Sequence, residues 1–249
     1  MRRAQFEEMY NLEETYWWFV GQRRLVAALA SRYASRPCPR ILDVGCGTGG
    51  ALAGLHTQGT TCGCDLSGIA LGLAQQRGLT NLAASRAESL AFRPDSVDVV
   101  LSCDVLEHVP RDDLALGEMR RVLTPGGVLI ATVPAYPRLW SSHDDVLGHV
   151  RRYQRRPLRQ AVTAAGFEIV KLTYAVTLAL PPIAVLRSMG KLRRKKPDVS
   201  AGVGLIILPQ PLNQLLVRGL DLERWLILRG RYLPWGCSLV VVARKPGRP

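Results

Sequence analysis

The residues with the clearest chemical potential form a glycine-rich loop. A strand-like segment, 41–44, leads into Gly45-Cys46-Gly47-Thr48-Gly49-Gly50, and Asp65 follows twenty residues after Gly45, at the end of the next strand-like segment. Glycines in such a loop let a ligand press against the backbone, and a carboxylate at this spacing can accept hydrogen bonds from ribose hydroxyls. The spacing predicts a nucleotide-type site whose ligand contacts are Gly45, Cys46, Gly47, Asp65 and Leu66.

Asp43, on the segment before the loop, favours one kind of nucleotide ligand. The pattern Gly45-x-Gly47-x-x-Gly50 also fits a dinucleotide fingerprint, so the loop alone is compatible with a nicotinamide-dependent oxidoreductase. A carboxylate just before the first glycine disfavours a pyrophosphate, whereas it suits a cationic group such as an ammonium or a sulfonium. A glycine turn that serves only helix–strand packing is the structural alternative.

Four segments in sequence order resemble the motifs of class I S-adenosylmethionine-dependent methyltransferases, over residues 39–135 and, more weakly, over 157–174. These segments are Asp43-x-Gly45-x-Gly47-x-Gly49, 87–92 with 95–100, 103–109, and 118–127. The resemblance implies S-adenosyl-L-methionine as cofactor, methyl transfer as activity, and cofactor contacts by Asp43, Ala87, Glu88, Cys103 and Asp104. One position departs from the pattern, because Arg86 stands where an acidic residue commonly precedes the alanine.

The segment 17–23 resembles the opening segment of a small-molecule branch of this superfamily, which includes quinone-type O-methyltransferases. That resemblance implies that Arg23 contacts the carboxylate of the methyl donor, since a guanidinium pairs with a carboxylate through two hydrogen bonds. The alternative is that Trp17 and Trp18 pack against the core while Arg23 is solvated.

Three histidines are candidate catalytic bases: His108, His143 and His149. Methyl transfer from a sulfonium is an in-line displacement, so the protein supplies orientation and, for an oxygen or nitrogen acceptor, a base. All three follow predicted strands whose carboxyl ends form the ligand crevice of such sheets. A structural role is the alternative for each histidine. A metal site formed by His143, Asp144, Asp145 and His149 is a weaker alternative. Their spacing matches no zinc pattern, so the sequence predicts no metal site.

Strands and helices alternate in the part of the chain that must position these residues. This alternation predicts an α/β fold, a doubly wound, mostly parallel seven-stranded Rossmann-like sheet. Strands are expected at 41–44, 60–65, 81–84, 97–102, 128–133, 167–174 and 238–242. Core helices are expected at 49–58, 67–77, 112–122 and 158–165. Pro125-Gly126-Gly127 is expected to end the helix 112–122. The expected domains are an N-terminal helical segment over the cofactor site (1–38), a cofactor-binding core (39–174), a basic and apolar helical cap insertion (175–236), and the last core strand with its tail (237–249).

The net charge of +13 is concentrated in the last hundred residues. Residues 1–150 hold 14 Lys and Arg against 16 Asp and Glu, whereas residues 151–249 hold 19 against 4. Such an asymmetry favours an anionic partner. Apolar residues at 177–186 adjoin the cations Lys191, Arg193, Arg194, Lys195 and Lys196, a pairing typical of proteins that rest on an anionic membrane surface. The alternatives are a solvated surface and a nucleic-acid platform, and no RNA-binding module accompanies the latter.

Together these features predict S-adenosylmethionine-dependent methyl transfer to a small or lipid-linked metabolite. An NAD(P)-dependent oxidoreductase and a non-catalytic nucleotide-binding module are the alternatives. The 249 residues are 47% hydrophobic, which excludes general disorder, and no apolar run reaches the roughly 18–20 residues that span a bilayer. Because the sequence shows no export signal, we expect reduced cysteines and a cytoplasmic protein that is peripheral at the inner face of the membrane. We expect no nucleic-acid partner. A homo-oligomer is compatible with the sequence.

Overall fold

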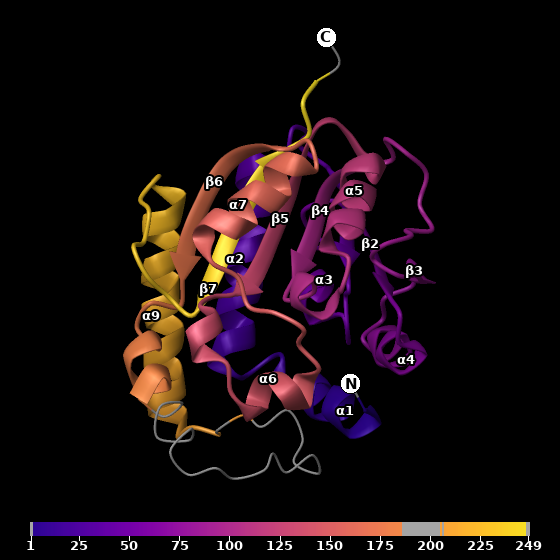
Figure 1. The fold of residues 1–249 in the computed structure, drawn as a ribbon. Helices are drawn as coiled ribbons and strands as arrows, with labels where there is room; N and C mark the ends of the chain where they lie inside the picture. Colours follow the sequence, from indigo (N-terminus) through magenta and orange to yellow (C-terminus); the bar gives the residue numbers. More distant parts are fainter. Residues whose placement is uncertain (1, 186–204, 206, 248–249) are drawn as a thin grey trace.

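The computed structural model describes residues 2–185, 205 and 207–247, and its centre is a seven-stranded sheet with helices on both faces (Figure 1). The strands are β1 (Arg40–Val44), β2 (Thr60–Asp65), β3 (Leu82–Ala84), β4 (Val97–Cys103), β5 (Leu123–Pro134), β6 (Glu168–Ala175) and β7 (Ser238–Arg244). Their order is β3-β2-β1-β4-β5-β7-β6. Strand β7 runs antiparallel to both of its neighbours, and the other pairs are parallel. The predicted fold class is confirmed.

Helices cover both faces of this sheet, so its interior strand β5 is buried on both sides. The helices are α1 (Arg3–Leu12), α2 (Trp17–Tyr33), α3 (Gly50–Ala53), α4 (Gly68–Gln76), α5 (Asp112–Val122), α6 (Ser142–Leu147), α7 (Arg155–Ala164) and α9 (Gln210–Leu228), with short 3₁₀ turns η1 (Leu106–His108) and η2 (Pro137–Leu139). Helices α5 and α7 lie on one face, and α2 and α9 on the other (Figure 1). Leu129 and Ala131 of β5 belong to the core on the first side, while Val128 and Ile130 belong to the core on the second. A strand buried on both faces is apolar without alternation, as in the predicted 128–133 segment.

Three predicted local features differ from the structure. The helix expected at 49–58 is the four-residue α3, because Gly54 follows it and Gly59 passes so close to Pro39 that a Cβ there would lie 2.0 Å from the Pro39 carbonyl oxygen. Helix α5 ends at Val122 as predicted, but Pro125-Gly126-Gly127 lie within β5, which begins at Leu123 rather than at 128. The stretch 134–156, for which the sequence predicts neither a strand nor a core helix, contains η2 and α6.

Helix α9 lies between β6 and β7 in the chain. The Glu223 carboxylate of α9 is buried and accepts hydrogen bonds from the backbone N–H groups of Val176 (2.7 Å) and Thr177 (2.8 Å) and from the Thr177 hydroxyl. These bonds hold the backbone at 176–177 in place, where a segment begins that ends in a short helical stretch at 180–185. The cationic cluster 191–196 lies outside the described residues. Within the described ranges, no helix has both the length and the hydropathy that crossing a membrane requires.

Candidate functional site

A cavity of about 750 Å³ lies at the carboxyl ends of β1, β2 and β4, beneath the N-terminal helices. Every residue predicted from the sequence to bind cofactor or to act as a base lines this cavity: Arg23, Asp43, Gly45, Cys46, Gly47, Asp65, Leu66, Ala87, Glu88, Cys103, Asp104, His108, His143 and His149. They come from segments more than 120 residues apart in the chain. The topology therefore brings the candidate donor loop and the candidate bases into one space.

The glycine loop is held in place by backbone geometry and by Asp65. Gly45 has a φ of +73°, in the left-handed region, and a Cβ there would lie 2.4 Å from a methyl group of Val105, so glycine is required on both grounds. The Asp65 carboxylate accepts hydrogen bonds from the backbone N–H groups of Gly47 (2.9 Å) and Ser67 (2.8 Å). Each of its oxygens keeps a lone pair for a ligand hydroxyl. Asp65 thus positions the loop as well as facing the cavity.

Asp43 is a buried carboxylate with an unpaired oxygen. Its residue exposure is 2%, and its Oδ1 has no hydrogen-bond partner within the described residues. Burial, together with the nearby carboxylates of Asp65 and Glu13, raises the pKa of Asp43 to about 8. A buried ionised carboxylate without a partner is costly, so this position suits a ligand that brings a positive charge. The electrostatics of the cavity therefore fit the ammonium and sulfonium groups of S-adenosylmethionine.

Asp104 links the end of β4 to the helix α2. It has a φ of +55°, its Oδ2 accepts a hydrogen bond from Gln22 Nε2 (2.5 Å), and its Oδ1 accepts one from Thr132 Oγ1 (3.2 Å). Burial raises the pKa of Asp104. Gln22 and Thr132 were not identified from the sequence, because no local pattern relates them to Asp104. The neighbouring Arg23 lines the cavity, where its positive charge also acts on the buried carboxylate of Glu13.

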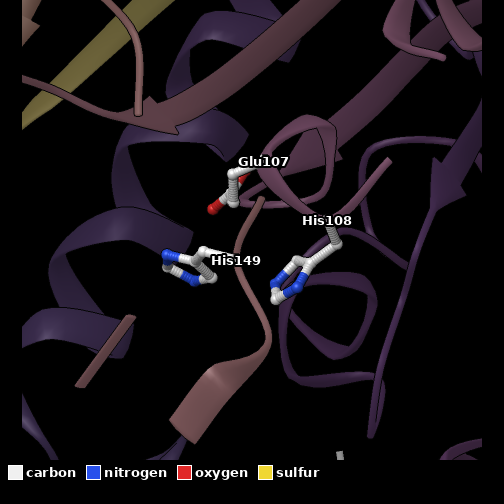
Figure 2. Close-up of side chains that lie close together, drawn as sticks. All are labelled: Glu107, His108 and His149. Carbon is white, nitrogen blue, oxygen red and sulfur yellow. The ribbon is translucent and has the colours of Figure 1, made fainter. Parts of the chain in front are cut away.

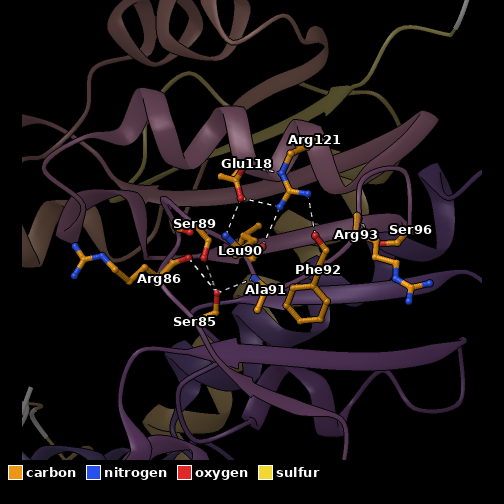
Figure 3. Close-up of polar contacts among 10 residues, drawn as sticks. All are labelled: Ser85, Arg86, Ser89, Leu90, Ala91, Phe92, Arg93, Ser96, Glu118 and Arg121. Carbon is orange, nitrogen blue, oxygen red and sulfur yellow. Dashed lines mark hydrogen bonds and ion pairs between the residues drawn. The ribbon is translucent and has the colours of Figure 1, made fainter.

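The loop 85–92 is held by two side chains of α5 (Figure 3). Glu118 accepts a hydrogen bond from the backbone N–H of Leu90 (2.8 Å), and Arg121 donates to the carbonyl oxygens of Leu90 and Phe92 (both 2.9 Å). This contact explains why the segment 118–127 accompanies the loop in the resemblance. Arg86, at the position that departs from the pattern, is exposed and forms an ion pair with Glu88 at 3.2 Å.

A compact group of three side chains lines the cavity after β4 and after α6: Glu107, His108 and His149 (Figure 2). The two histidine rings meet edge to face with centroids 4.7 Å apart. Burial lowers the pKa of His108 to about 4, so its imidazole is neutral at pH 7. Glu107 was not identified from the sequence, although it stands beside His108 in the segment 103–109 that was. Only the folded chain brings Glu107 next to His149, which is 42 residues away in the sequence.

His149 is oriented by a buried network. Its Nδ1 lies 2.9 Å from Oδ1 of Asp144, and the same oxygen accepts a hydrogen bond from Arg152 Nε (2.7 Å). Desolvation would raise the pKa of Asp144, but His149 and Arg152 hold it well below its usual range. The Ser141 backbone N–H donates to the other oxygen at 2.9 Å. Asp144 is therefore committed to positioning His149, while the predicted base His143 lines the cavity from α6.

The chain is similar in sequence to known methyltransferases. Residues 42–131 match the profile of a methyltransferase domain. The chain is 31% identical over 153 residues to the ubiquinone biosynthesis O-methyltransferase of Agrobacterium fabrum, which covers 54% of this chain and 61% of that protein. It is 27% identical over 174 residues to the 24-methylenesterol C-methyltransferase 2 of Oryza sativa, covering 62% of this chain and 47% of that protein. The alignments thus span less than two thirds of these relatives.

A solved structure shows the same fold at low sequence identity. The phosphoethanolamine N-methyltransferase 2 of Haemonchus contortus, solved in complex with S-adenosyl-L-methionine, has a TM-score of 0.58 and 20% identity, and the match covers 90% of this chain and 52% of that one. The fold is therefore one on which this cofactor is bound.

We expect Asp65→Ala to weaken binding of S-adenosylhomocysteine, the demethylated product, by about 2–3 kcal/mol, because the ribose loses its acceptor and the glycine loop loses its tether. Isothermal titration calorimetry measures this loss, and urea unfolding checks that the fold is retained. Asp65→Asn is the matched control, since it keeps one oxygen acceptor and should lose less. An unchanged affinity in Asp65→Ala would contradict the assignment.

Binding of a cationic ligand beside Asp43 should release a proton. With its pKa raised to about 8, the Asp43 carboxyl is largely protonated at pH 7 and ionises when a positive charge binds next to it. Affinity for S-adenosylhomocysteine should therefore rise between pH 6 and pH 8. Calorimetry at pH 7 in two buffers of different ionisation enthalpy should give close to one proton released, and close to none for Asp43→Asn. Equal proton release in the two proteins would show that another group titrates.

Proposed function

Because residues 42–131 form a methyltransferase domain of the class I S-adenosylmethionine-dependent superfamily, we propose that this chain transfers a methyl group from S-adenosylmethionine to a small or lipid-linked acceptor held in the same cavity. The observation that carries the proposal is the buried Asp43 carboxylate, unpaired at Oδ1 beside the glycine loop. Neither a dinucleotide pyrophosphate nor a purely structural turn calls for a negative charge at that point.

The residues that would hold the donor are those of the glycine-loop side of the cavity. When bound, S-adenosylmethionine supplies a methyl group that its sulfonium has already activated. Asp65 would accept hydrogen bonds from the ribose, Ala87 and Glu88 would contact the adenine, and Arg23 would pair with the carboxylate. Cys46 and Cys103 line the same space, and burial raises the pKa of both thiols, so they contribute surface rather than charge.

The residues that would hold the acceptor lie after β4 and β5. Glu107, His108 and His149 would face the nucleophilic atom, with His149 fixed in orientation by Asp144. The predicted role of His143 rests on its position in the cavity. Around these polar groups the lining is apolar: Trp17, Trp18, Phe19, Val109, Leu139, Leu147, Ile183 and Leu205. An apolar lining with a few polar groups supports an acceptor with a sizeable hydrophobic part.

A lipid-linked acceptor agrees with the outer face of α9. Leu215, Leu222 and Trp225 are exposed there, and Arg218 and Arg229 alternate with them at helical spacing. An apolar stripe with arginines is suited to the surface of an anionic membrane. The two curated relatives carry names that refer to ubiquinone biosynthesis and to a sterol. We therefore extend the proposal to a protein that meets its acceptor at a membrane surface.

Calorimetric titration with S-adenosylhomocysteine and with NAD⁺ separates the candidate activities. We expect binding of the first and none of the second, followed by transfer of label from methyl-labelled S-adenosylmethionine to a component of a lipid extract. Binding of NAD⁺ alone would indicate an oxidoreductase. Binding of the methyl donor without turnover on any extract would indicate a nucleotide-binding module.

Co-sedimentation with vesicles tests the membrane contact. We expect the protein to bind phosphatidylglycerol-containing vesicles more strongly than pure phosphatidylcholine vesicles, and less so at high salt. Replacing both Arg218 and Arg229 by Gln should weaken binding about 30-fold, at about 1 kcal/mol for each arginine near the surface. Arg111→Gln, an exposed arginine on the other face of the sheet, is the control and should have no effect. Equal binding to both vesicle types would oppose the proposal.

A further inference from the structure

We propose that Glu107, His108 and His149 bind one divalent transition-metal cation, such as Zn²⁺, at the acceptor part of the cavity. One ligand atom from each residue lies within 4.8 Å of the other two, and the three side chains converge from η1 and from the segment after α6 (Figure 2). All three residues line the cavity, so a bound cation would be open to it. In the described part of the chain, this is the group of side chains whose geometry could hold a metal ion.

The Glu107 carboxylate is the observation that calls for a ligand. The residue is 1% exposed, and both carboxylate oxygens lack a hydrogen-bond partner among the described residues. Arg152, a buried cation of the same network, is already engaged, because its guanidinium donates to Asp144 (2.7 Å) and to the Ala135 carbonyl oxygen (3.0 Å). A buried carboxylate without a hydrogen-bond partner carries a large desolvation cost when it is ionised. A cation bound directly to it removes that cost.

The donor set indicates the kind of cation. Two imidazoles and one carboxylate form the His₂Glu set that holds catalytic zinc in other folds, where a fourth position is left to water or substrate. Metal–ligand bonds of about 2.0–2.2 Å place ligand atoms about 3–4 Å apart, so small side-chain rotations would close the present group around an ion. Imidazole ligands also favour Zn²⁺ or Co²⁺ over Mg²⁺ and Ca²⁺, which prefer oxygen ligands.

In both histidines, one ring nitrogen contacts another part of the protein and leaves the other nitrogen for the metal ion, as in metal-bound histidines. Asp144 lies 2.9 Å from Nδ1 of His149, which leaves Nε2 for the group. A ring nitrogen of His108 contacts the backbone of Gly148, which leaves its other nitrogen. The backbone N–H of Val150 donates to the carbonyl oxygen of Glu107 (2.8 Å) and ties the two segments together. Carboxylate and carbonyl partners of this kind fix the ring tautomer and strengthen the metal bond.

The cation would determine which acceptor atom is methylated, a consequence that rests on the proposed function. A hydroxyl bound at the open position loses its proton to solvent more readily, because the cation stabilises the alkoxide. The oxygen then forms its bond to the methyl carbon as the bond between sulfur and that carbon breaks, and the donor leaves as neutral S-adenosylhomocysteine. The site therefore favours O-methylation.

Metal binding can be tested without turnover. The 249-residue chain is stripped with a chelator and titrated with Zn²⁺ by calorimetry and with Co²⁺ by visible absorption. We expect one ion per chain, and at least tenfold weaker binding in Glu107→Gln and in His149→Asn. His56→Asn, at an exposed histidine outside the group, is the matched control and should bind as the unmodified chain does. Circular dichroism and thermal unfolding establish that each variant is folded.

Three results would overturn the proposal: no Zn²⁺ binding by the unmodified chain, equal binding by a folded Glu107→Gln or His149→Asn protein, or a thiolate-to-Co²⁺ charge-transfer band that places the ion on cysteine. Binding of S-adenosylhomocysteine is measured separately on the stripped protein. Failure of that binding would refute the proposed function and leave the metal result standing, whereas retained donor-product binding without a metal ion would refute the metal site alone.

Discussion

The carboxyl edge of the sheet is organised around buried carboxyl groups with oxygens that the described part of the protein leaves without hydrogen-bond partners. Strand β1 brings Asp43 into a position where Oδ1 has no hydrogen-bond partner among the described residues, and Glu107 reaches a comparable position from the turn after β4. Such groups persist only if the surrounding fold is stable enough to hold them. The doubly buried strands β4 and β5 and the helices on both faces supply that stability, so the apolar core and the charged edge are parts of one arrangement.

Contacts between segments distant in sequence hold the loops at this edge of the sheet in place around the cavity. Asp65 ties the glycine loop to β2, Glu118 and Arg121 of α5 fix the loop 85–92, and Gln22 of α2 reaches Asp104. Each contact joins a cavity-lining loop to a regular element. The loops are therefore positioned by rigid supports, which is how binding segments combine an irregular backbone with defined geometry.

The sequence was most informative where a function depends on local spacing. The glycine loop with Asp65 and the strands around it follow from patterns of fewer than thirty residues, and the structure places all of them as expected. Glu107 beside His149, Asp144 beside Arg152 and Gln22 beside Asp104 could not be predicted, because only the folded sheet brings these residues together. The short α3 and the strand assignment of Pro125 to Gly127 were not predicted for a related reason: contacts with Pro39 and with the backbone of Lys245 override local preference.

The antiparallel strand β7 has a consequence for the synthesis of the chain on the ribosome. Because β7 lies between β5 and β6, β6 can take its place in the sheet only after the whole intervening segment 176–237 has been translated. Until then the apolar β5 has an open edge, and β6 has no strand to pair with. Pairings of such large sequence separation form slowly, and open edges invite association with other chains. The nascent protein therefore passes through an interval in which the edges of β5 and β6 that pair with β7 are open.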